Sequence, residues 1–224
     1  MRFIPKNEFL KFELISKSFK QALSEDFYKE STLKIIQTVK PKTLSWKTYY
    51  YNSTKENLLK NGDFQEETAP LSVERIDNLK HWNISHGGDG FIFEMNKSPL
   101  SKTGICLVTS YSVCSRSQIV NLSRFNPQFL QSLPIINCST WYQGRNDGGS
   151  RYSLNISLFD EKNVLIDTRE QEVTTSGEWK ELLIVFDSYK RPVHFIHWND
   201  EGKDSNPWAG HYGSKISNSR IYFS

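Results

Sequence analysis

The sequence has few cysteines and no long hydrophobic run. Its longest apolar run, Leu182–Phe186, has five residues, far fewer than the roughly 20 that a helix needs to cross a bilayer. We therefore expect no membrane span. Pro5, Lys6 and Glu8 precede any apolar stretch, so a signal peptide is not expected either, and the predicted location is cytoplasmic.

The cysteine pattern excludes two common frameworks. Cys106, Cys114 and Cys138 are odd in number and form no C-x-x-C pair with a histidine partner, so neither a set of disulfides nor a zinc site is expected. Reduced, mostly buried thiols fit a cytoplasmic chain. The sequence also contains Asn-x-Ser/Thr triplets, which are glycan acceptors in a secreted chain. In a cytoplasmic chain they fit the polar faces of strands.

Signatures of catalysis are absent as well. No G-x-S-x-G elbow, H-E-x-x-H helix or Walker loop occurs, and the glycines of Gly87–Gly90 lack phosphate-binding spacing. His194 and His197 are three residues apart, which on a strand directs their rings to opposite faces. We therefore predict a protein that is not an enzyme and that has no cofactor and no metal site.

Charge of one sign is not concentrated strongly anywhere in the chain. The formal net charge is +3, and residues 1–60 hold twelve Lys/Arg against six Asp/Glu. Acidic residues such as Glu13 and Glu25 alternate with these basic ones. This interleaving indicates a solvated helix face, and we expect no binding to nucleic acid.

The front of the chain has helical periodicity. Phe12, Ile15, Phe19 and Leu23 fall on one helical face. A second segment is predicted to end before Pro41. Residues 1–40 are thus expected to form two short helices. The following aromatic segment, 41–56, is too rich in Trp and Tyr for a flexible tether and is expected to pack on the strands that come after it.

From about Asn57 the hydrophobic period changes from 3.6 to 2. Half-buried strands are predicted where apolar residues alternate, and turn signals rich in Gly, Asn and Asp separate them. Many short strands of this kind indicate a mainly β fold, an antiparallel sandwich of two sheets. Residues 126–133 are predicted to form one short helical turn. The alternating residues are Thr103, Ile105 and Leu107, then Tyr152, Leu154, Ile156 and Leu158.

Two polar, aromatic loops are the best candidates for a binding site. They span residues 141–149 and 204–213. Trp208 lies beside Pro and Gly, so its ring either contacts the apolar face of a sugar or plugs the end of the sandwich. Asp147 either accepts hydrogen bonds from hydroxyl groups or simply forms a turn.

Several segments resemble the F-box-associated domain of the glycoprotein-recognising F-box proteins, a domain shared with the non-specific cytotoxic cell receptor-like protein. The resemblance runs from residue 57 to residue 224. It implies about ten strands in a jelly-roll-like antiparallel sandwich after a short helical segment. The segments, in family order, are Asn57–Asn61, Trp82 with His86–Gly90, Cys114–Leu122, Trp141–Asp147, and Trp208–Gly210 followed by Ser217–Ser219.

The resemblance also implies a function. Members of this family recognise substrates for a Skp1–cullin–F-box ubiquitin ligase, and their ligand class is the chitobiose core of high-mannose N-glycans on misfolded glycoproteins. The implied function is a non-enzymatic adaptor that presents glycosylated or other protein clients. The alternative is a free cytosolic lectin or protein-binding module without a ligase.

Carried over position by position, the family's glycan pocket falls on five residues. Tyr111 and Trp208 match its aromatic positions, and Asp147 matches its aspartate. Pro207 stands where the family has a second stacking ring, and Ala209 stands where its best-known glycan binder has an ammonium group. The resemblance therefore implies a pocket that keeps three of its features and lacks two.

The front segment resembles the later helices of an F-box. Phe19 and Leu23 would be its anchors on Skp1, and the alternative is ordinary helix packing. The usual opening of that motif is missing or reduced to Met1–Leu14. Residues 1–40 are thus expected to be a degenerate F-box, residues 41–56 a linker and residues 57–224 the sandwich.

Overall fold

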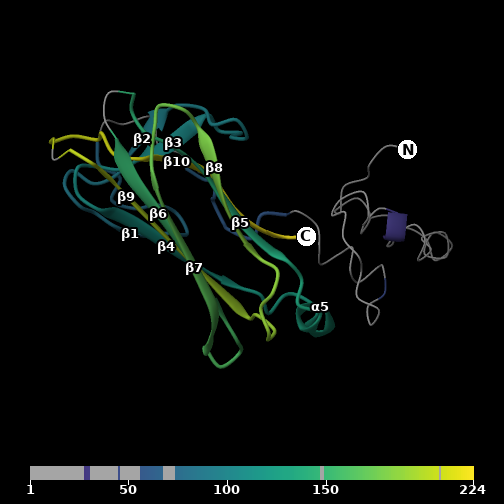
Figure 1. The fold of residues 1–224 in the computed structure, drawn as a ribbon. Helices are drawn as coiled ribbons and strands as arrows, with labels where there is room; N and C mark the ends of the chain where they lie inside the picture. The colour runs from purple at the N-terminus through teal and green to yellow at the C-terminus, as the bar shows by residue number, and fades with distance from the viewer. Residues whose placement is uncertain (1–27, 31–44, 46–55, 68–73, 147–148, 207) are drawn as a thin grey trace.

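The computed structural model describes residues 28–30, 45, 56–67, 74–146, 149–206 and 208–224. Its described part contains two antiparallel five-stranded sheets packed as a sandwich (Figure 1), which confirms the predicted fold class. Residues 28–30 are helical. The rest of the predicted helical segment, including Phe19 and Leu23, and most of the predicted linker lie outside the described residues.

Each sheet mixes strands from distant parts of the sequence. One has the order β1-β4-β9-β6-β7 and the other the order β2-β3-β10-β5-β8. The strands are β1 (Asn83–Ser85), β2 (Ile92–Met95), β3 (Ile105–Val108), β4 (Cys114–Asn121), β5 (Ile136–Gln143), β6 (Ser150–Phe159), β7 (Leu165–Thr174), β8 (Lys180–Phe186), β9 (Phe195–Asp204) and β10 (Lys215–Phe223).

The alternation that predicts β6 is confirmed, and that of β3 is not. Tyr152, Leu154, Ile156 and Leu158 are fully buried between the sheets. In β3, however, residues 106–108 are all fully buried rather than half-buried. Cys106 lies opposite Glu94 of β2, and Glu94 forms an ion pair with Lys215 of β10. We attribute the burial of the second face of β3 to the aliphatic stems of this pair.

Within the sandwich domain, the described helix α5 (Pro127–Gln131) forms where one helical turn was predicted. The Asn126 side chain accepts hydrogen bonds from the backbone N–H groups of Gln128 and Phe129, and proline occupies the first turn. Phe129 packs edge-on against Phe223, with 5.1 Å between the ring centroids. The helix is therefore fixed to the end of β10.

The three cysteines are free and buried, as predicted. Burial raises the pKa of the Cys106 thiol to about 12. Burial also raises the pKa of the Cys138 thiol. Both thiols therefore stay protonated near neutral pH and are poor nucleophiles.

An ion pair lies inside the sandwich. Arg116 of β4 donates from Nε to Asp200 Oδ1 of β9 at 2.9 Å, and both side chains are fully buried. The Tyr152 hydroxyl donates to Asp200 Oδ2 at 2.6 Å, and Arg116 Nη2 donates to Ser219 Oγ at 2.6 Å. The Arg116 guanidinium also lies 4.2 Å from the ring centroid of Trp82. This cluster links both sheets and the segment before β1.

The antiparallel strands give the sandwich two different ends. The connections β1–β2, β3–β4, β5–β6 and β9–β10 lie at one end, which we call the loop end. Helix α5, the β6–β7 turn and the β8–β9 connection lie at the other, the helix end (Figure 1). The Leu58 N–H donates to Ile221 O near the end of β10. The chain therefore enters the sandwich at the helix end.

Candidate binding site

The predicted site residues that the structure describes all lie at the loop end. Tyr111 is in the β3–β4 connection and is half-buried. Trp208 and Ala209 are in the β9–β10 connection and are exposed. The other two predicted residues, Asp147 and Pro207, lie outside the described residues.

A buried hydroxyl joins the two connections that carry Tyr111 and Trp208. Ser110, which is fully buried, donates from Oγ to the carbonyl oxygen of Gly210 at 2.7 Å. The same Oγ accepts a hydrogen bond from the backbone N–H of Asp89 at 2.9 Å. Three connections that are far apart in the sequence therefore meet at one side chain.

Asp89 closes this network from the β1–β2 connection. Its Oδ2 accepts from the backbone N–H of Gly210 at 2.8 Å, and its carbonyl oxygen lies 3.3 Å from His211 Nε2. Gly88 adopts a φ of +59°, and a Cβ at this position would lie 2.9 Å from the Tyr111 ring. Glycine thus allows both the turn and the close approach to Tyr111.

The rim of the loop end is aromatic. The Trp208 side chain is 61% exposed. That exposure rules out the interpretation of Trp208 as a plug of the sandwich. Nearby, the Arg145 guanidinium lies 4.5 Å from the ring centroid of Tyr212. An exposed ring beside fixed backbone groups suits a ligand that has both a flat apolar face and hydroxyl or amide groups.

Among the residues with described positions, no group of three or more His, Cys, Asp and Glu side chains is placed to hold a metal ion. The described chain also contains no helix long and apolar enough to cross a membrane. The described residues of the loop end offer aromatic rings and hydrogen-bonding groups.

Sequence reasoning missed the roles of Asp89, Ser110 and Arg145. Asp89 and Ser110 occur in or beside recognisable turns, but their partners lie 21 and 100 residues away in the sequence. The only local signal is the pair of glycines beside Asp89, Gly88 and Gly90, which both adopt positive φ. Such glycines indicate a tight turn but not the partner that the turn contacts.

We predict that Ser110→Ala loosens the loop end without unfolding the sandwich. The Asp89 N–H and the Gly210 carbonyl would each lose their hydroxyl partner, at a cost of about 1–3 kcal/mol of unfolding free energy. Hydrogen exchange of the Asp89 amide should accelerate by about tenfold. Ser112→Ala, a half-buried serine in the same connection, is the control. Equal exchange in both variants would contradict the role of Ser110.

Two solved structures share this fold, and one of them is bound to a sugar. The carbohydrate-binding module TmCBM61 in complex with β-1,4-galactotriose has a TM-score of 0.50 and 17% identity, and the match covers 75% of this chain and 99% of that one. A tailspike protein of bacteriophage CBA120 has a TM-score of 0.52 and 11% identity, over 75% of this chain and 21% of that one. At such identities the likeness establishes the fold alone.

Relatives at higher identity are F-box only proteins. F-box only protein 27 of Mus musculus is 32% identical over 168 residues, which is 68% of this chain and 60% of the mouse protein. F-box only protein 6 of Bos taurus is 29% identical over 195 residues, which is 80% of this chain and 69% of the bovine protein. The chain thus spans less than two thirds of the length of the mouse relative.

The sequence model of the F-box associated region matches residues 49–223. The matched range includes all ten strands and both connections that carry Tyr111 and Trp208. It also covers well over half of the chain. The resemblance found in the motifs is therefore confirmed, and the chain belongs to the F-box associated family.

Proposed function

We propose that this protein is a non-enzymatic adaptor that binds a client at the loop end and a ubiquitin ligase through its front segment. The observation that carries the proposal is the family match over residues 49–223, which includes the joined connections of Tyr111 and Trp208. The chain enters the sandwich at the helix end, where the Leu58 N–H bonds to Ile221 O. This contact lies at the opposite end of the sandwich from the loop end.

The proposed ligase contact uses Skp1 and, through it, a cullin. Phe19 and Leu23 are its proposed anchors. In this proposal residues 1–40 are a degenerate F-box, residues 41–56 a linker and residues 57–224 the client-binding sandwich. The protein would act in the cytoplasm on misfolded glycoproteins or other proteins and direct them to degradation, with no cofactor and no binding to nucleic acid.

The proposed ligand is the chitobiose core of a high-mannose N-glycan. The exposed Trp208 ring and the half-buried Tyr111 ring support a sugar ligand. Asp147, Pro207 and Ala209 complete the proposed pocket. Pro207 and Ala209 supply neither the second ring nor the cation, so we expect the natural protein to bind the glycan weakly.

A second candidate function is a free cytosolic lectin or protein-binding module. One observation favours it: the hydrogen bonds that join the three connections of the loop end come from Asp89, Ser110 and Gly210, which all belong to the sandwich. The sandwich therefore supplies the hydrogen-bond network that holds the loop end together. Purification of the full chain from cells, scored for Skp1 and cullin, separates the two functions.

We predict that Phe19→Ala with Leu23→Ala abolishes the recovery of Skp1. Each truncation would remove a side chain that anchors the contact, and anchors of this kind typically carry most of an interface's binding energy. A matched pair, Leu33→Ala with Ile36→Ala in the second predicted helix, should recover Skp1 as the parent does. Equal recovery with both pairs would contradict the proposed anchors, and absence of Skp1 from the parent would favour the free module.

A further inference from the structure

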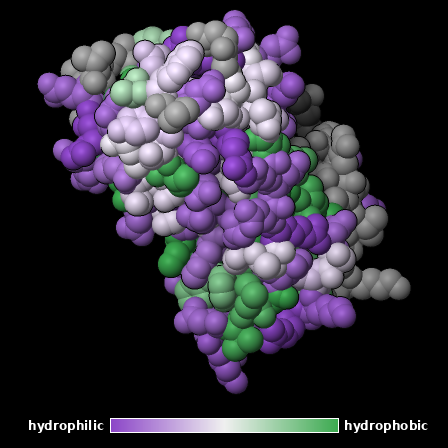
Figure 2. Space-filling view, turned by 60° about the vertical axis from the view of Figure 1, so that its left-hand side comes forward, coloured by the Kyte–Doolittle hydropathy of each residue, from purple (hydrophilic) through white to green (hydrophobic). Residues whose placement is uncertain are grey.

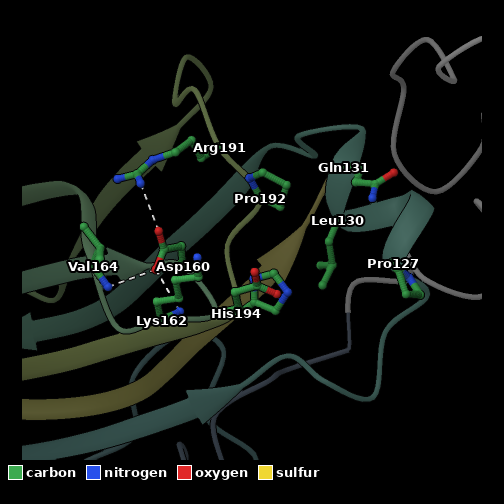
Figure 3. A pocket seen from close by; sticks show the side chains of 10 residues that line it. Pro127, Leu130, Gln131, Asp160, Lys162, Val164, Arg191, Pro192 and His194 are labelled. Carbon is green, nitrogen blue, oxygen red and sulfur yellow. Dashed lines mark hydrogen bonds and ion pairs between the residues drawn. The ribbon is translucent and has the colours of Figure 1, made fainter.

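A pocket of about 600 Å³ lies at the helix end, away from the loop end (Figure 3). Its walls come from three separate parts of the chain: α5, the β6–β7 turn and the β8–β9 connection. Pockets that bind ligands in proteins typically have volumes of about 300–1,000 Å³. This pocket therefore has the size of a binding site, and the proposed function of the loop end does not use it.

One wall of the pocket is fixed by hydrogen bonds. Asp160 Oδ1 accepts from the backbone N–H groups of Lys162 and Val164, each at 2.9 Å. Asp160 Oδ2 accepts from Arg191 Nη1 at 2.9 Å, and Arg191 Nη2 donates to the carbonyl oxygen of Leu165 at 3.1 Å. Figure 3 shows these contacts around Asp160. The turn and the β8–β9 connection are thus held together before any ligand binds.

The opposite wall comes from α5. Pro127, Leu130 and Gln131 line it, and Leu130 belongs to the hydrophobic core. The neighbouring Phe129 packs on Phe223 and so holds the helix in place. In Figure 3 the side chains of the helix and those of the turn lie on opposite sides of His194.

His194 supplies one polar group of the pocket that has no partner among the described residues. Its Nδ1 is buried and has no hydrogen-bond partner among the described residues. Its Nε2 has no partner there either, and unlike Nδ1 it is not shielded from water. A ligand in the pocket can therefore reach Nε2, and it would form its hydrogen bond with that atom.

Two neighbouring aliphatic residues at the edge of the pocket are exposed. Val164, which lines the pocket, is 49% exposed, and Leu165, which lies beside it in the sequence, is 48% exposed. Figure 2 shows hydrophobic side chains gathered near the lower tip of the molecule. An apolar rim next to an apolar pocket indicates contact with another protein rather than with an enclosed small molecule.

We propose that this pocket binds a short extended peptide segment of a partner protein, with one large aliphatic side chain between α5 and the β6–β7 turn and a backbone group hydrogen-bonded to His194. Glu161 and Lys162 place both signs of charge at the pocket, which favours a neutral segment. A second copy of the chain is disfavoured, because a stable dimer needs about 800 Å² of surface from each partner. The aliphatic rim here consists of two residues.

The test selects short random peptides from a displayed library on the full chain, and measures the enriched peptides by calorimetry. The expected peptides share one large aliphatic residue. Val164→Lys should weaken their binding by about tenfold or more, because the rim would no longer bury an apolar side chain. Leu183→Lys is the matched control, since Leu183 is 46% exposed but lies on β8. It should leave the affinity unchanged.

Two further variants separate this proposal from other outcomes. His194→Phe keeps a ring of similar shape and removes both nitrogens, so the affinity should fall by about fivefold while the melting temperature holds. Trp208→Ala should have no effect, which distinguishes this pocket from the loop end. The proposal is overturned if no peptide is enriched, or if the enriched peptides bind the Val164→Lys and His194→Phe variants as tightly as the parent.

Discussion

Replacement of Asp200 with alanine is expected to destabilise the sandwich by about 3–5 kcal/mol. The variant would leave the Arg116 guanidinium fully buried without its carboxylate, and the Tyr152 hydroxyl without its acceptor. An uncompensated buried charge is among the most destabilising changes a single substitution can make. Thermal unfolding followed by circular dichroism should show a melting temperature lower by roughly 6–20 °C.

The neighbouring acid provides the control for that result. Glu201 is the next residue of β9, and it is exposed on the outer face of the sheet. Glu201→Ala should change the unfolding free energy by less than about 0.5 kcal/mol. Equal melting temperatures for the two alanine variants would contradict the assignment of Asp200 as the partner of a buried charge.

A compensating double variant tests whether the unpaired charge of Arg116 causes the loss of stability. Arg116→Met combined with Asp200→Leu removes both charges and fills most of the space, so it should recover much of the stability lost in Asp200→Ala. Burial already raises the pKa of Tyr152, and the nearby Asp200 carboxylate raises it further, so its hydroxyl remains a donor that needs an acceptor. Addition of Tyr152→Phe should therefore improve the double variant. A double variant no more stable than Asp200→Ala would show that the charge itself is not the cause.

The sequence predicts that both members of this ion pair face the core, but it does not predict that they pair. Arg116 lies in step with Cys114 and Val120, and Asp200 lies in step with Ile196 and Trp198, so the period of 2 already puts both charges on inward faces. Their pairing depends on the register of β4 against β9, where Arg116 is opposite Asp200. Strand register between residues 84 positions apart is set by the whole sheet, and local patterns do not specify it.

The fold was therefore more predictable than the site. Strand β6 was predicted from the strict alternation of Tyr152 to Leu158, and helix α5 lies within the helical turn predicted for residues 126–133. The loop end depends on contacts between separate connections, such as the bond from Ser110 to Gly210. From the sequence, only the family resemblance assigned Tyr111 and Trp208 to one pocket. In the structure, the bond from Ser110 to Gly210 joins the connections that carry them.

The pocket beside α5 could not be predicted from local sequence signals either. Pro127, Asp160 and His194 lie on three different connections, and none belongs to a motif that indicates a ligand. In the sequence, His194 looks like one of a histidine pair at the start of a strand. Its lack of a hydrogen-bond partner is a property of the packed chain, so it could not be inferred from composition or spacing.

The loop end should gain affinity for a glycan when its two missing groups are restored. Pro207→Tyr adds a stacking ring, which contributes about 0.5–1.5 kcal/mol. Ala209→Lys adds a charged hydrogen-bond donor, which contributes about 1.5–3 kcal/mol. Together these contributions correspond to roughly thirty-fold to a thousandfold or more in affinity. We expect the double variant to bind chitobiose at least about tenfold more tightly than the parent, measured by calorimetry.

Two control variants determine what a gain in affinity would mean. Pro207→Tyr with Ala209→Glu has the same ring and the opposite charge, so it should gain only the part due to the ring. Trp208→Ala added to the double variant should cancel the gain, because Trp208, which is 61% exposed, would no longer enclose the sugar with the new ring. If the double variant does not bind chitobiose while its melting temperature is unchanged, the loop end is not a remnant sugar pocket. The exposed ring of Trp208 would then be explained by contact with a client polypeptide, because its exposure already excludes a role as a plug.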